Sequence, residues 1–71
     1  MNVGNIVMFT DNGRYAKYFF GQIAEVTSSS ISKTSGEKHV RVKWQTPVKY
    51  HDRYATVSDF SASKFTLISE Q

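Results

Sequence analysis

Residues His39–Gln45 read H-V-R-V-K-W-Q, and the alternation in this stretch decides the fold. Three apolar residues take turns there with four basic or polar ones: Val40, Val42 and Trp44 against His39, Arg41, Lys43 and Gln45. Successive side chains of a β-strand point to opposite faces of the sheet. The pattern therefore predicts a central strand with one face in the core and one basic face in water.

Four further segments are rich in β-forming residues and predict the other strands. They are Val3–Thr10, Tyr15–Thr27, Ala55–Val57 and Phe65–Ile68. In the first we expect Val7 and Phe9 to face the core. The second is expected to place Phe19, Gly21 and Ile23 on one face. Gly21 is expected to mark a bend, a bulge or the close approach of a neighbour such as Trp44, and a bulge is expected near Ala24.

The segments between these strands carry turn signals. Asp11–Arg14 contains Asn-Gly, which favours a turn, and Pro47 is expected to end the central strand because proline cannot donate a backbone hydrogen bond. Residues 28–37 are Ser-rich and predict a flexible hairpin loop. Ser58–Ser63 predicts a single helical turn capped by Ser58, and residues 69–71 are expected to fray.

The size and composition of the chain indicate a single small domain. It has 71 residues, and its ten aromatic side chains are enough for one compact core. The absence of cysteine suits a reducing compartment, and there is neither an apolar run of spanning length nor a signal-peptide pattern. We therefore expect an intracellular, cytoplasmic protein without a membrane association, monomeric by default.

Five short strands, one long loop and a helical turn before the last strand predict an all-β fold. The specific expectation is a small five-stranded SH3-like barrel over residues 1–71, with one short 3-10 turn before the final strand.

Several motifs of the chain resemble the SH3-like barrel group. They are Gly4-x-x-Val7, Gly21-x-Ile23-x-x-Val26, Val40-x-Val42-x-Trp44, and Asp59-Phe60 ahead of Phe65-x-Leu67-Ile68. Within the group the chain is most similar to Tudor and KOW-type domains, in which a polar turn precedes a stretch like Tyr15-Ala16-Lys17-Tyr18. A weaker likeness, in G-x-I-A-x-V and V-R-V-K-W-x-x-P-V-x-Y, is to the small stromal subunit of photosystem I. Gln45–Val48 departs from the aspartate, aromatic, glycine turn of Tudor domains that read methylated side chains.

The positive charge of the chain is concentrated in one central segment. The formal net charge is +3, and residues 38–54 hold five basic residues against Asp52 alone. An ordinary solvated strand face is one explanation, since lysine and arginine favour solubility. A basic surface that contacts a partner is the other.

Residues suited to catalysis or metal binding are few. His51 and Asp52 are neighbours whose side chains point apart on an extended chain, so they cannot form a base with its orienting acid. The spacing of His39, His51 and Asp52 in the sequence matches no known set of metal ligands. The sequence therefore predicts no enzyme, no metal and no cofactor.

Two binding functions from different classes follow. The first is a nucleic-acid-associated module that binds DNA or RNA, because cations neutralise phosphates while exposed aromatic rings stack on unpaired bases. The alternative is a protein-interaction adaptor that docks on a larger assembly, for example on an acidic protein surface. The predicted contact residues are His39, Arg41, Lys43, Gln45, Lys49, Tyr50, Arg53 and Tyr54, with a possible aromatic patch of Tyr15, Tyr18 and Phe20.

Overall fold

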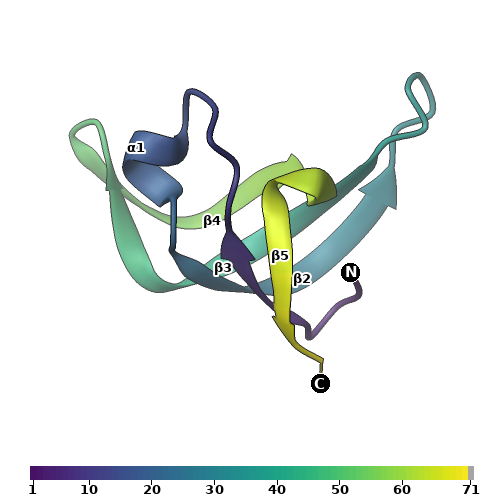
Figure 1. Cartoon of the computed structure of the whole chain (residues 1–71), viewed down its shortest axis with the longest axis horizontal. Coiled ribbons are helices and arrows are strands. Elements are labelled where there is room, and N and C mark those ends of the chain that lie inside the picture. The colour runs from purple at the N-terminus through teal and green to yellow at the C-terminus, as the bar shows by residue number, and fades with distance from the viewer. Residues whose placement is uncertain (71) are drawn as a thin grey trace.

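The longest strand, β3 (Lys38–Tyr50), contains the alternating stretch and has a neighbouring strand on each side. The computed structural model describes residues 1–70. The remaining elements in chain order are β1 (Ile6–Phe9), α1 (Ala16–Phe19), β2 (Ile23–Ile31), β4 (Arg53–Ser61), the 3-10 helix η1 (Ala62–Lys64) and β5 (Phe65–Ser69) (Figure 1).

The five strands form one antiparallel sheet in the order β4-β3-β2-β1-β5. This confirms the predicted all-β class, the number of strands and the short 3-10 turn directly before the last strand. The sheet is curved (Figure 1), but β4 and β5 remain its two edges across residues 1–70. Closure into a barrel therefore stays a prediction.

The predicted inner face of β3 is confirmed. Val40, Val42 and Trp44 are all buried, at 1%, 0% and 3% exposure. The predicted strand end at Pro47 is wrong, because β3 continues to Tyr50. The paired residues stop at Ala24–Trp44 on one side and skip from Lys43 to Val48 on the other. Pro47 therefore sits where no neighbouring strand needs its missing N–H.

The aromatic residues after the first turn form a helical turn and not a strand, so the prediction for Tyr15–Thr27 is wrong over its first half. Asp11 accepts a hydrogen bond from the Gly13 N–H at 3.0 Å, and α1 begins three residues later at Ala16. A helix this short is not stable alone, and its one buried residue, Phe19, attaches it to the core. Gly21 follows at φ 82°, a left-handed conformation that suits the end of a helix.

The core-facing residues of β2 also differ from expectation. Ala24 and Val26 are fully buried, whereas Ile23 is only partly buried. The register shift lies between Val26 and Ser28 instead of near Ala24. A side chain added at Gly21 would meet nothing within 4 Å, which excludes close approach of a neighbour among the roles expected for this glycine. The chain bends there with a positive φ, which was another of those roles.

The Ser-rich segment is partly strand. Residues 28–31 belong to β2 and pair with β3 from Arg41 to Lys38, which leaves a turn at residues 32–37. The prediction of a loop over 28–37 is therefore wrong for its first four residues, because backbone pairing with β3 outweighs their low apolar content. At the other end Ser69 is still in β5, and Gln71 lies outside the described residues.

The strand predicted at Ala55–Val57 is longer in the structure, where it is β4. β4 runs over nine residues, and the helical turn begins at Ala62, four residues after the predicted cap Ser58. Ser58 faces the interior of the sheet instead, where its Oγ accepts a hydrogen bond from Trp44 Nε1 at 2.9 Å. This bond satisfies the buried indole N–H, so the serine at this position supports the core and not a helix.

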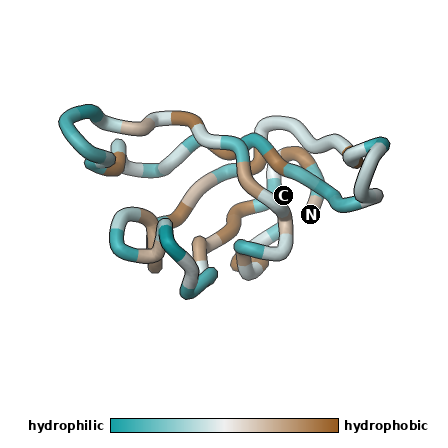
Figure 2. Tube along the Cα trace, turned by 90° about the horizontal axis from the view of Figure 1, so that it is seen from above, coloured by the Kyte–Doolittle hydropathy of each residue, from teal (hydrophilic) through white to brown (hydrophobic). Residues whose placement is uncertain are grey.

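Aromatic rings fill the space enclosed by the curved sheet. Phe9 is central and fully buried, with Phe19, Phe60, Phe65 and Trp44 around it at centroid distances of 5.1–6.4 Å. Val7, predicted to face the core with Phe9, is also fully buried. Hydrophilic residues gather at the two projecting ends of the molecule, which are the β3–β4 turn and the β2–β3 turn (Figures 1 and 2).

Candidate functional site

The predicted outward row of β3 exists, but its charge is balanced by neighbouring strands. Arg41, Lys43 and Gln45 are exposed and His39 is half-buried. Asp59 of β4 lies opposite Arg41, and Glu25 of β2 lies opposite Lys43. On the sheet face each of these two cations therefore has an acidic residue opposite it, and within residues 1–70 Arg41 and Asp59 form an ion pair.

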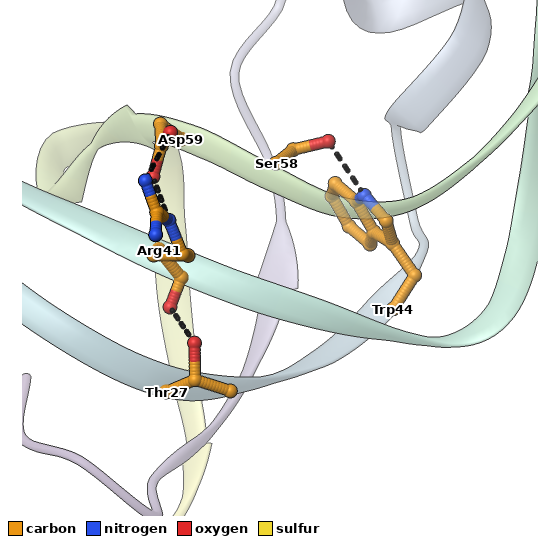
Figure 3. Close-up of polar contacts among 5 residues, drawn as sticks. All are labelled: Thr27, Arg41, Trp44, Ser58 and Asp59. Atoms are coloured by element: carbon orange, nitrogen blue, oxygen red, sulfur yellow. Dashed lines mark hydrogen bonds and ion pairs between the residues drawn. The ribbon is translucent and has the colours of Figure 1, made fainter.

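Arg41 and Asp59 form an ion pair with two hydrogen bonds. Arg41 Nε donates to Asp59 Oδ1 at 2.9 Å and Nη2 donates to Oδ2 at 3.3 Å (Figure 3). This hydrogen bonding raises the pKa of Arg41 and lowers the pKa of Asp59. The carbonyl of Arg41 accepts a third bond, from Thr27 Oγ1 at 3.1 Å. With its guanidinium committed to a carboxylate, Arg41 is a poor candidate for contacting phosphate.

The other predicted contact residues lie apart from this row, at the β3–β4 hairpin end. In the hairpin ladder Lys49 pairs with Tyr54 and Tyr50 pairs with Arg53. Tyr54 is 68% exposed, whereas Tyr50 is half-buried. The turn between the strands consists of His51 and Asp52, and His51 has a φ of 58°.

Two residues of the predicted aromatic patch meet this hairpin. Tyr18 contacts Tyr50 edge to face at a centroid distance of 4.6 Å, and Tyr15 lies 6.3 Å from Tyr50. Figure 1 shows α1 beside the β3–β4 turn at the same end of the molecule. Phe20 does not join them: it is 51% exposed and forms none of the ring pairs found within residues 1–70. The patch is therefore built from two segments distant in sequence, with Tyr50 in the place predicted for Phe20.

Two cations of this end were not predicted as contact residues. The guanidinium carbon of Arg14 lies 5.5 Å from the ring centroid of Tyr15, and Lys17 Nζ lies 5.0 Å from that of Tyr18. Both were missed because Arg14 was assigned to the turn Asp11–Arg14 and Lys17 to a strand beginning at Tyr15, so the two were not expected to lie together. The separation of Tyr15 and Tyr18 by three positions was the available signal for a helical turn.

We call this region the basic tip, and define it as residues 14–18 together with residues 49–54. Its charged residues are Arg14, Lys17, Lys49, Arg53 and Asp52. Four cations against one acid give +3, which equals the formal charge of the whole chain. None of the four cations forms an ion pair within the described part of the chain, where the salt bridges are Arg41–Asp59 and Lys64–Asp11. Outside the basic tip the chain has five basic and five acidic residues, so the net positive charge of the protein lies at the tip.

A small pocket opens within the basic tip. Its volume is about 190 Å³, and its lining consists of Arg14, Tyr15, Lys17, Tyr18, Tyr50 and His51. No acidic side chain lines it. Aromatic faces and cations together suit a ligand that is planar and anionic.

No group of three histidine, cysteine or acidic side chains that could hold a metal ion occurs within residues 1–70. No helix among them is both long enough and apolar enough to cross a membrane.

Comparison of the chain with protein-family models, with curated proteins and with solved structures gives no match. The similarity to Tudor and KOW-type domains therefore stays a prediction from sequence motifs, and the function has to be argued from the site itself.

Proposed function

We propose that this protein is a non-enzymatic binding module that associates with nucleic acid through the basic tip. The observation that carries the proposal is the placement of charge: the basic tip carries a net charge of +3, and two of its cations, Arg14 and Lys17, lie against tyrosine rings in one pocket. Cations that bind phosphates release counterions, which favours association, and aromatic rings add stacking on bases.

The contact surface in this function is the basic tip and not the outward face of β3 that the sequence predicted. Lys49, Tyr50, Arg53 and Tyr54 remain in it, and Arg14 and Lys17 are added. His39, Arg41, Lys43 and Gln45 become secondary, because Asp59 and Glu25 oppose the two cations among them. Removal of one positive charge should therefore weaken nucleic-acid binding more at the basic tip than on the sheet face.

The test is binding of a fluorescently labelled oligonucleotide of about 15 nucleotides, followed by anisotropy over a range of salt concentrations. Affinity should fall steeply as salt rises. Lys17→Gln should weaken binding and reduce the slope of log K against log salt by about 0.7–0.9, the contribution of one phosphate contact. Absence of binding at low salt would refute the proposal.

Two further variants locate the surface. Lys33→Gln removes the same charge from the β2–β3 turn, at the opposite end of a molecule that is 32 Å long (Figure 1). This distance exceeds the screening length of about 10 Å at 0.1 M salt, so the affinity should hardly change. Lys43→Gln removes a charge from the sheet face and should have a smaller effect than Lys17→Gln. The reverse order would return the contact surface to β3.

A second candidate function is a protein-interaction adaptor, and the free edge of β4 favours it. A groove of about 440 Å³ runs beside this strand, lined by Tyr15, Phe19, Tyr50, Ala55, Val57, Ser58, Asp59 and Phe60. Val57 is 50% exposed there, and a partner segment that adds a strand to β4 would cover it. Stoichiometric co-purification of one protein that survives nuclease treatment, and that Val57→Lys abolishes, would support this function over the first.

A further inference from the structure

The pocket of the basic tip has walls of two kinds, and each suits a different part of one ligand. Tyr15, Tyr18, Tyr50 and His51 provide aromatic surface, while Arg14 and Lys17 provide positive charge. A ligand that is only anionic would use the cations and leave the rings without contacts. A ligand that is only apolar would bury the cations without compensation. A nucleotide carries both a planar base and a phosphate, so it uses both walls.

The aromatic wall is held in place by the core. Tyr50 stacks on Phe19 at 5.6 Å with an interplanar angle of 27°, and Phe19 stacks on Trp44 at 4.9 Å and 17°. Tyr18 and His51 then contact Tyr50 at 4.6 Å and 4.3 Å. A chain of rings thus leads from the centre of the sheet to the surface. Rings that are already fixed lose little conformational entropy when a ligand binds, which favours affinity.

The turn residue His51 supplies a second, independent observation. Its backbone is left-handed at φ 58°, a conformation that is uncommon for residues other than glycine. The side chain is exposed, so it does not fill the core. Its ring nevertheless lies against both Tyr18, at 5.4 Å, and Tyr50. Histidine is one of the residues enriched in this conformation, and here the turn places its imidazole in the lining of the pocket, beside the two tyrosines.

We propose that this pocket takes an unpaired nucleobase, with the adjoining phosphates on Arg14 and Lys17, and that the protein consequently prefers single-stranded to double-stranded nucleic acid. This inference rests on the proposed function and goes beyond it. In a duplex the bases are stacked inside the helix, so only the phosphates reach the basic tip. In a single strand the base itself reaches the rings, and each stacked base adds affinity regardless of its sequence.

The test compares oligo(dT), oligo(U) and a mixed-sequence duplex of the same length at a single salt concentration. The wild-type protein should bind both single strands at least about 5-fold more tightly than the duplex, because stacking of one base corresponds to a factor of this size or larger. A preference between oligo(dT) and oligo(U) decides between DNA and RNA as the source of the base and leaves the pocket assignment intact.

The diagnostic variant is His51→Asn, because asparagine tolerates the left-handed backbone but has no ring. It should lower affinity for the single strands by about 5-fold and leave duplex affinity unchanged. Ile31→Asn is the control: it places asparagine at another exposed position, at the far hairpin, and should alter neither affinity. Amide chemical shifts would verify that both variants keep the fold.

The possible failures separate the two proposals. Equal affinity for single strand and duplex, or an unchanged single-strand affinity in His51→Asn, would overturn the base pocket. If binding remains salt-dependent and sensitive to Lys17→Gln in that case, the proposed function stands. Loss of all nucleic-acid binding at low salt would overturn both, and binding of a peptide with an exposed aromatic side chain in the same pocket would then assign it to a protein partner.

Discussion

Phe19 lies almost parallel to Trp44, with 4.9 Å between ring centroids and 17° between ring planes. One ring belongs to the central strand and the other to a helical turn of four residues. Phe19 is the only buried residue of that turn, and its ring packs on Trp44, Phe9, Tyr50 and Phe60, so this side chain is the main attachment of α1 to the sheet. The placement of the basic tip depends on it, because α1 carries Lys17 and Tyr18.

Replacement of Phe19 by alanine should therefore lower the free energy of unfolding by about 3–5 kcal/mol, the range for removal of a buried phenylalanine. Phe20→Ala is a matched control, because the neighbouring ring is 51% exposed and its loss should cost about 0.5 kcal/mol or less. Urea denaturation measures both values. Equal costs for the two substitutions would show that α1 is not attached through Phe19.

Ser58→Ala should cost about 1–3 kcal/mol, because it removes the acceptor of the Trp44 indole N–H and leaves that donor buried without a partner. Ser30→Ala, on an exposed position of β2, is the control and should be close to neutral. Thermal unfolding followed by circular dichroism compares the two variants. A neutral Ser58→Ala would mean that water replaces the hydroxyl.

Substitutions at His51 should follow the demands of its backbone, whose φ is 58°. His51→Gly should change the free energy of unfolding by about 1 kcal/mol or less, since relief of the backbone strain offsets the lost ring contacts with Tyr18 and Tyr50 and the greater entropy of the unfolded chain. His51→Val should lower it by about 1–2 kcal/mol, because a β-branched side chain is strained there. Chemical denaturation gives the order of stabilities. Valine equal to glycine would contradict the left-handed turn.

The ion pair of Arg41 with Asp59 should make stability depend on acid pH. Hydrogen bonding to Arg41 lowers the folded-state pKa of Asp59 below its ordinary value of 3.8. Below that value the unfolded chain binds the proton more readily than the folded one does. The stabilisation is therefore complete above about pH 5 and is lost as the pH falls through the folded-state pKa.

Asp59→Asn should flatten this part of the pH profile, and Asp52→Asn serves as the control because Asp52 lies in a turn and forms no ion pair in the described structure. The measurement is the free energy of unfolding from neutral pH to about pH 3. The effect should be small and should shrink with added salt, because both side chains are more than half exposed. An unchanged acid slope in Asp59→Asn would show that the pair is not formed in solution.

The sequence predicted those strands in which apolar and polar residues alternate with a period of two. Val40, Val42 and Trp44, like Val7 and Phe9, alternate with polar or exposed residues, so the buried face could be assigned before the structure was known. Tyr15–Phe20 has rings at spacings of both two and four, and this pattern does not distinguish a strand from a helical turn. The burial of Phe19 against Trp44 decides for the helix, and that contact is not visible in the local sequence.

The sequence predicted only those parts of the candidate site whose residues are close together in the chain. Lys49, Tyr50, Arg53 and Tyr54 are close in sequence, so their association was expected. The charge on Arg41 was overvalued because its partner Asp59 lies eighteen residues away and approaches only when β3 pairs with β4. Arg14 and Lys17 reach the site only through the fold of α1. In each case the missing information was which segments lie side by side, which local residue patterns do not contain.

The register shift in β2 gives the two ends of the molecule different local stabilities. Before the shift β2 carries Ala24 and Val26, which are fully buried, and after it Ser28–Ile31 are all exposed. Opening the distal part of the β2–β3 hairpin therefore breaks backbone hydrogen bonds without exposing buried side chains of β2. Amide hydrogens there should exchange through local fluctuations, whereas those of Ala24 and Val26 should exchange only when the whole domain unfolds. The end of the β2–β3 hairpin far from the basic tip is thus expected to open locally while the rest of the domain stays folded.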